Sequence, residues 1–161
     1  MPTVLTISQS TEVAFMFLLP LMLDRLGVKP TMALGLTVWT CQLFVLGLRL
    51  PLAVILPALM GHGIFICCFL VAGQVFVNRQ ATHDIRASVQ AILLVISGSG
   101  LLLGHLGVGW IRELTDENYR TAYFGASVIS GTMLLLFLFG FSGPPRHGIS
   151  EDTLVPPAEI A

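Results

Sequence analysis

The sequence predicts an all-α integral membrane protein with about five transmembrane helices. Hydrophobic residues make up 55% of the 161 residues, charged residues make up only 11%, and the mean hydropathy is +0.86. A soluble domain carries about 25% charged residues. The apolar residues also gather in long stretches, and about 20 such residues cross a bilayer core as a helix. Both observations indicate that lipid is the main solvent of this chain.

Five apolar stretches of this length are bounded by charges, proline or polar clusters. They run over about residues 3–23, 31–48, 51–77, 87–111 and 121–141. Together they define one predicted transmembrane domain, residues 1–142. Residues 143–161 are rich in proline, glycine and charge, so we predict a disordered tail.

Positive charge predicts how the chain lies in the membrane, because cytoplasmic loops carry an excess of Lys and Arg. The linkers after the first and third spans, together with the tail, hold five such residues: Arg25, Lys29, Arg79, Arg86 and Arg146. The opposite side holds three: Arg49, Arg112 and Arg120. This bias predicts an external N-terminus and a cytoplasmic tail.

Charge and cysteine content argue against a nucleic-acid-binding protein and against a zinc protein. The 8 Lys+Arg residues nearly balance the 9 Asp+Glu residues, so the chain lacks the basic surface that binds nucleic acid. Cys41, Cys67 and Cys68 lie inside apolar stretches, and the adjacent pair lacks the spacer typical of zinc sites. We predict neither a metal nor a cofactor.

Glu12 is the first candidate functional residue, because it lies near the middle of the first span. A charge there costs about 2.5–3.5 kcal/mol on insertion scales. Gln9 is three residues earlier, so both side chains project from one helical face. We expect this face to line a polar cavity, where Glu12 could exchange a proton. The alternative is a structural hydrogen bond to a neighbouring helix.

Two histidines and a pair of glycines are further candidates. His62, in the third span, could bind a solute or relay a proton, or could equally be a packing residue. His105, in the fourth span, is predicted to be structural. Gly100 and Gly104 form a Gly-x-x-x-Gly pair that favours tight contact with a neighbouring helix. That contact could also slide during transport.

The linker after the first span carries Asp24, Arg25, Gly27 and Lys29. This spacing resembles the loop motif of the major facilitator superfamily, Gly-x-x-x-Asp-Arg-x-Gly followed by basic residues. Pro20 stands at the position of the leading glycine. In a twelve-helix carrier, this loop would make the five spans the eighth to twelfth helices.

Three further segments resemble the nucleoside:proton symporter family of bacterial nucleoside permeases. They are the S-Q-S-T-E run at 8–12, His62-Gly63 followed by Gly73-Gln74, and the R-A-S-V-Q run at 86–90. The resemblance implies that Gln9 and Glu12 contact the nucleoside and take part in proton coupling. Cys67 stands where the tenth helix of the family carries an Asp involved in substrate recognition, so Cys67 is a candidate substrate contact.

The sequence therefore predicts a proton-coupled symporter of a small polar solute, best matched by a nucleoside, in a bacterial inner membrane. Its predicted partners are the solute, the proton, the lipid bilayer and the helices that complete a twelve-helix carrier. One alternative is an inactive or partner-dependent membrane fragment. A second is an intramembrane enzyme using Glu12, His62 or Ser99, which no sequence motif supports.

Overall fold

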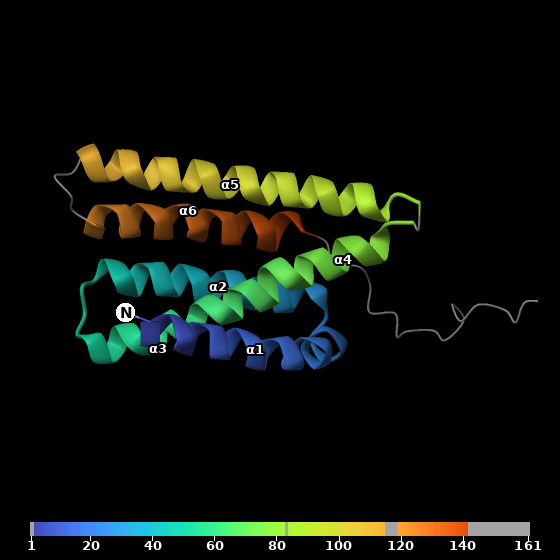
Figure 1. The fold of residues 1–161 in the computed structure, drawn as a ribbon, viewed down its shortest axis with the longest axis horizontal. Helices are drawn as coiled ribbons and strands as arrows, with labels where there is room; N and C mark the ends of the chain where they lie inside the picture. Colours follow the sequence, from blue (N-terminus) through green and yellow to red (C-terminus); the bar gives the residue numbers. More distant parts are fainter. Residues whose placement is uncertain (1, 83, 115–118, 142–161) are drawn as a thin grey trace, which may run out of the picture.

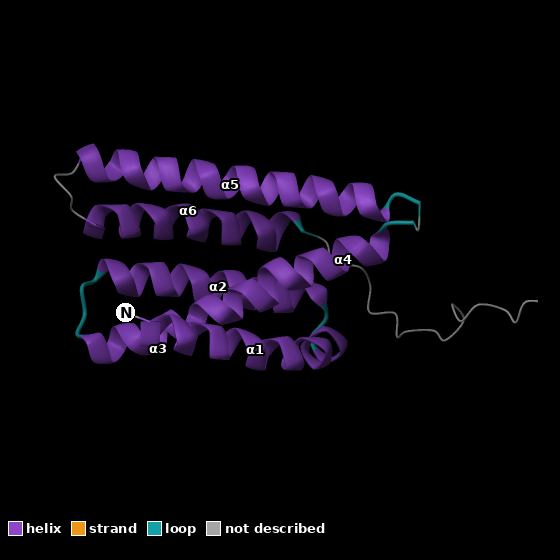
Figure 2. Ribbon diagram, viewed as in Figure 1, coloured by secondary structure: helices purple, strands orange, loops and turns teal. Residues whose placement is uncertain are grey.

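The computed structural model describes residues 2–82, 84–114 and 119–141, and nearly all of them are helical. The elements are α1 (Pro2–Arg25), α2 (Val28–Gly47), α3 (Leu52–Phe65), the π-helix η1 (Ile66–Val71), α4 (Ala72–Gln80), α5 (Arg86–Leu114) and α6 (Tyr119–Gly140). Figure 2 shows no strand among these described residues. Because α3, η1 and α4 follow one another without a break, they form one rod. The predicted all-helical fold of five long segments is confirmed.

Four of the five segments are long and apolar enough to cross a membrane. Within the described ranges they are Val28–Gly47, Leu52–Gln80, Arg86–Leu114 and Tyr119–Gly140. Helix α1 contains the predicted first span but is not among these four, so its crossing of the membrane stays a prediction. The predicted tail, residues 143–161, lies outside the described residues.

The helices alternate in direction, as consecutive membrane spans do (Figure 1). The end of α1, the linker between α4 and α5, and the end of α6 lie at one end of the bundle, and the linker between α2 and α3 lies at the other. A hydrogen bond supports this arrangement, since Lys29 Nζ, at the start of α2, donates to the Leu138 carbonyl near the end of α6 at 2.8 Å. Which end faces the cytoplasm stays a prediction.

Helix α2 lies at the centre of the packing, between the α3–η1–α4 rod and α6. A Cβ atom on Gly35 would lie only 2.9 Å from the Phe69 backbone nitrogen, so α2 and η1 approach each other backbone to backbone. On its other side, Thr40 of α2 and Ser130 of α6 share a hydrogen bond of 2.8 Å. Membrane helices commonly associate through small residues such as Gly35, which allow close backbone contact, and through interhelical hydrogen bonds such as that between Thr40 and Ser130.

The turn between α1 and α2 depends on Gly27. Its φ angle of 88° lies in a region that glycine adopts far more readily than other residues. The Thr31 hydroxyl donates to the Gly27 carbonyl at 2.8 Å, which fixes the first turn of α2 to this linker. Gly27 therefore allows the tight connection between α1 and α2.

Candidate functional site

Glu12 and Gln9 lie on α1, where this helix packs along the α3–η1–α4 rod. Gln9 is exposed and Glu12 is half-buried. Their separation of three residues places them on the same face of the helix. In the structure, the face that the sequence predicts as polar therefore carries one exposed and one partly buried side chain.

Cys67 joins the π-helical segment to Glu12. Its side chain is fully buried, and its Sγ donates to the backbone carbonyl of Glu12 at 3.1 Å. Because the thiol is used in this contact between helices, a solute would have to displace the bond to reach it. A π-helical turn often occurs at functional sites, since its extra residue per turn alters which side chains face a neighbour.

His62 contacts a different neighbour. Its ring lies 5.3 Å from the Trp39 ring of α2, with the two planes tilted by 46°. Cys67 thus reaches α1, whereas His62 reaches α2. Among the described residues, Cys67 and Glu12 are therefore in contact, whereas His62 packs against a different helix.

A row of aromatic rings continues from this histidine, and the sequence reasoning missed it. Trp39 stacks on Phe65 with ring centroids 4.6 Å apart, and Phe65 stacks on Phe69 at 5.5 Å. Phe69 then meets Phe137 of α6 edge-on at 6.1 Å. The signal was available, because Phe65 and Phe69 are four residues apart and therefore lie on one helical face.

Gln42 is a second residue that the sequence reasoning missed. Its side chain is 5% exposed, and its Oε1 has no hydrogen-bond partner within the described part of the chain. This oxygen lies beside α3, 3.2 Å from where a Cβ on Gly61 would be. A polar residue in the middle of an apolar span is the same signal that identified Glu12.

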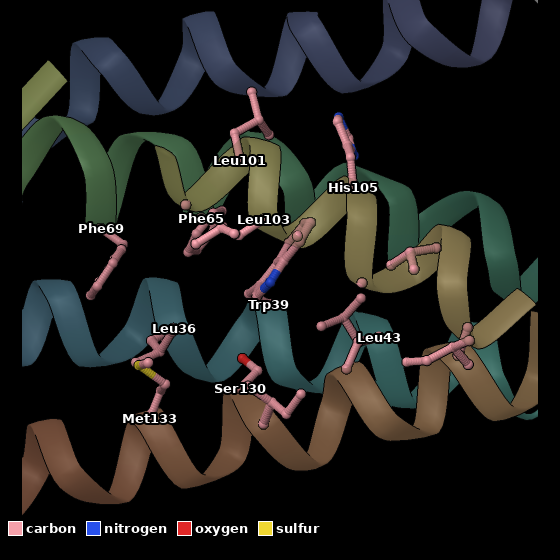
Figure 3. Close-up of a pocket in the computed structure, with 18 of the residues that line it drawn as sticks. Leu36, Trp39, Leu43, Phe65, Phe69, Leu101, Leu103, His105, Ser130 and Met133 are labelled. Atoms are coloured by element: carbon pink, nitrogen blue, oxygen red, sulfur yellow. The ribbon is translucent and has the colours of Figure 1, made fainter. Parts of the chain in front are cut away.

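A large groove lies between part of α5 and the neighbouring helices (Figure 3), while α5 also contacts α4 and α6. It has a volume of about 980 Å³ and is lined mainly by apolar side chains of α2, the α3–η1–α4 rod, α5 and α6. His105, Gly100 and Gly104 all lie on its α5 side. A Cβ atom on either glycine would meet nothing within 4 Å. The predicted tight contact at this glycine pair is therefore not made by the described helices of this chain, because no neighbour occupies that side of α5.

The residues of the loop motif lie together at one end of the bundle. Asp24 and Arg25 are exposed, whereas Lys29 is partly buried and bonded to α6. The cation at position 29 thus lies at the C-terminal end of α6, where unpaired carbonyl groups favour positive charge. The described residues contain no group of three metal-ligating side chains.

Comparison with known proteins assigns the chain to a family. A sequence profile of the family described as "Nucleoside H+ symporter" matches residues 1–145, nearly the whole chain. The chain belongs to this family. It is 29% identical over 143 residues to the nucleoside permease NupG of Escherichia coli K12, covering 86% of the chain and 34% of the permease. It is 25% identical over 146 residues to the xanthosine permease of the same organism, covering 85% and 35%.

A solved structure has the same fold. A crystal structure of the nucleoside transporter NupG, an aspartate-to-alanine mutant, superimposes with a TM-score of 0.79 at 24% sequence identity. The match covers 86% of the chain and 37% of that structure. The chain therefore spans about a third of the length of the symporters that it matches. The predicted resemblance to nucleoside:proton symporters is confirmed, and the family is one of multi-pass membrane transporters.

Proposed function

We propose that this chain forms part of a proton-coupled nucleoside symporter and carries the carboxylate that couples the proton to the solute. The observation that carries the proposal is that Glu12 is a partly buried acidic residue on α1, in a chain that belongs to the nucleoside H+ symporter family. Ionisable groups at such positions commonly mark ion pathways in transporters. Transport, rather than an intramembrane enzyme reaction, is the function that family membership supports.

Three other candidate residues have roles in this proposal. Gln9 contacts the nucleoside, since its exposed amide shares the face of Glu12 and offers both donors and an acceptor. Cys67 positions α1 through its bond to the Glu12 carbonyl. His62 serves packing through its contact with Trp39. The chain lies in the bacterial inner membrane, with its C-terminus in the cytoplasm.

Because the chain spans a third of its relatives, the test requires a complete carrier. In a hybrid, this chain replaces the matching portion of E. coli NupG in cells that lack other nucleoside permeases. We expect Glu12→Gln to abolish accumulation of radiolabelled nucleoside driven by a pH gradient. Exchange of internal for external nucleoside should persist, because the glutamine amide resembles the protonated carboxyl in shape and carries no charge.

The matched control is Glu113→Gln, which removes the same charge from an exposed position near the end of α5. This variant should accumulate nucleoside normally. Normal accumulation by Glu12→Gln would refute the coupling role. Loss of exchange as well as accumulation, at an equal amount of protein in the membrane, would mean that Glu12 is structural. A hybrid without any uptake would favour the inactive alternative.

A further inference from the structure

The contact between α2 and α3 contains a buried polar atom without a partner. The Gln42 side chain is 5% exposed, and its Oε1 accepts no hydrogen bond within the described part of the chain. The oxygen lies against Gly61, where an added Cβ atom would be only 3.2 Å away from it. A buried acceptor that stays unpaired destabilises the arrangement that contains it. Gly61 offers no side chain that could donate to this oxygen.

A donor is one residue away. His62 follows Gly61 directly, and its ring carries an N–H group in either neutral tautomer. Consecutive residues of an α-helix are rotated by about 100° about the helix axis. His62 therefore meets a different part of α2, the Trp39 ring, at 5.3 Å between ring centroids. A shift of α3 by one residue position would bring His62 to the place that Gly61 now occupies opposite Gln42.

The rod contains a segment that can supply this shift. The π-helix η1 joins α3 to α4, and a π-helix holds more residues in each turn than an α-helix does. If α4 stays in place and η1 becomes α-helical, the same residues make more of a turn, so α3 rotates by about one residue position. The sense of this rotation places each residue of α3 where the preceding residue was. His62 then takes the place of Gly61.

We propose that η1 is a register switch of the rod and that Gln42 holds its second position. In the first position, which the structure shows, His62 packs on Trp39 and the Cys67 thiol donates to the Glu12 carbonyl. In the second position, the His62 ring donates to Gln42 Oε1. Cys67 turns away from α1 in this position, because it lies near the start of η1 and rotates with α3.

The switch connects two interfaces of the rod. The first position has the bond to α1, and the second has a bond to α2, so each position is held by one interhelical contact. A Cβ atom at the place of Gly61 would lie 2.8 Å from a Val38 methyl group, so α3 also moves slightly away from α2 in the second position. The use of the switch in transport rests on the proposed function, since a proton or solute that moves α1 would favour one of the two positions.

Disulfide trapping tests the switch in the full chain in membranes. The three native cysteines are first replaced by serine. Gln42→Cys is then combined with Gly61→Cys, which reports the first position, or with His62→Cys, which reports the second. A disulfide requires Cβ atoms about 3.5–4.5 Å apart. We expect the 42–61 pair to form readily on oxidation and the 42–62 pair to form more slowly, as the second position is visited.

Deletion of Leu70 separates a register shift from simple flexibility. Leu70 lies in η1 and its side chain is 40% exposed. Without it, the rod can run as a continuous α-helix with Gly61 already opposite Gln42, so no shift remains to be made. We expect the 42–61 disulfide to persist and the 42–62 disulfide to be lost. Leu70→Ala is the matched control, because it removes most of the side chain but keeps the residue count, and it should retain both disulfides.

Two results would overturn the switch. One is a 42–62 disulfide that forms equally well with and without Leu70, and the other is its absence from the parent chain while the 42–61 disulfide forms. Failure of the 42–61 pair would contradict the contact between Gln42 and Gly61 from which the inference starts.

Transport by the NupG hybrid tests whether the switch is used. Gln42→Leu and His62→Phe should each slow the exchange of nucleoside, and the double variant should be no slower than either one, because both remove the same bond. His62→Gln keeps an N–H donor and should restore exchange in part. Normal exchange by Gln42→Leu, or losses that simply add, would overturn this use of the switch. A hybrid that gives the expected disulfides without any uptake would sink the proposed function alone.

Discussion

The interface between α2 and the α3–η1–α4 rod differs from the surface of α5 in what surrounds its glycines. Gly35 and Gly61 are buried, and added Cβ atoms would lie 2.9 Å from the Phe69 backbone nitrogen and 2.8 Å from a Val38 methyl group. In α5, Gly104 is exposed and a Cβ atom would meet nothing. The first interface is complete within the chain, whereas the second has only one side.

This difference separates two uses of small residues in membrane helices. Lipid tails are as apolar as the side chains, so helices associate through close packing and interhelical hydrogen bonds rather than through burial from water. Helix α2 has both, since Gly35 allows backbone contact with η1 and Thr40 bonds to Ser130 of α6. The glycines of α5 have the means for such contact without a partner. We therefore expect substitutions at the two places to act on different properties.

The largest effect on stability is expected at Gly35. In Gly35→Ala, the new methyl group would collide with the backbone of Cys68 and Phe69, which cannot move away as a flexible side chain can. Overpacking of this kind costs about 1–3 kcal/mol. The measurement is the unfolding temperature of the purified chain in detergent.

Gly104→Ala is the matched control for this comparison, because it adds the same methyl group where no neighbour lies within 4 Å. It should not lower the unfolding temperature of the chain, because alanine also has the higher helix propensity. An equal loss in both variants would mean that the effect does not come from packing at Gly35, because helix propensity alone favours alanine at both positions. An unchanged unfolding temperature in Gly35→Ala would contradict the close approach of α2 and η1.

A smaller effect is expected at the hydrogen bond between α2 and α6. Thr40→Val keeps the shape of the side chain but removes the hydroxyl that bonds to Ser130. Interhelical hydrogen bonds of this kind contribute about 0.6 kcal/mol on average. The change is measured by unfolding in a denaturing detergent. Thr37→Val is the control, since Thr37 is on the same helix and its hydroxyl donates to the Ala33 carbonyl one turn back.

The two sets of glycines also show why the helices could be predicted from the sequence and the contacts between them could not. Long apolar runs bounded by charges, proline or polar clusters predicted the five helical segments, because a bilayer demands such runs whatever the tertiary contacts are. Glu12 was found because a carboxylate in such a run is conspicuous. Gln42 gives the same kind of signal more weakly and was overlooked.

Contacts between helices could not be predicted in the same way. In the sequence, Gly100-x-x-x-Gly104 is a stronger packing motif than the isolated Gly35, yet in the described chain Gly35 makes the close contact and the pair makes none. Which glycine meets a neighbour depends on the rotation of each helix and on which helices are present. The bond from Cys67 to the Glu12 carbonyl likewise depends on the π-helical turn at 66–71, and nothing in the alternation of apolar residues indicates that turn.

The smallest effect is expected at the end of the bundle, where Lys29 bonds to the Leu138 carbonyl. Lys29→Met removes a cation from the C-terminal end of α6, and because the bond is exposed the cost should lie at the lower end of about 0.3–1 kcal/mol. Screening by salt should weaken the contribution, so the difference from the parent chain shrinks as ionic strength rises. Arg86→Met is the control of opposite sign, because Arg86 is at the start of α5, where a helix disfavours positive charge. If both variants lost stability equally, the effect would come from surface charge in general, and the contact between α2 and α6 would depend on Thr40 and Ser130 without help from Lys29.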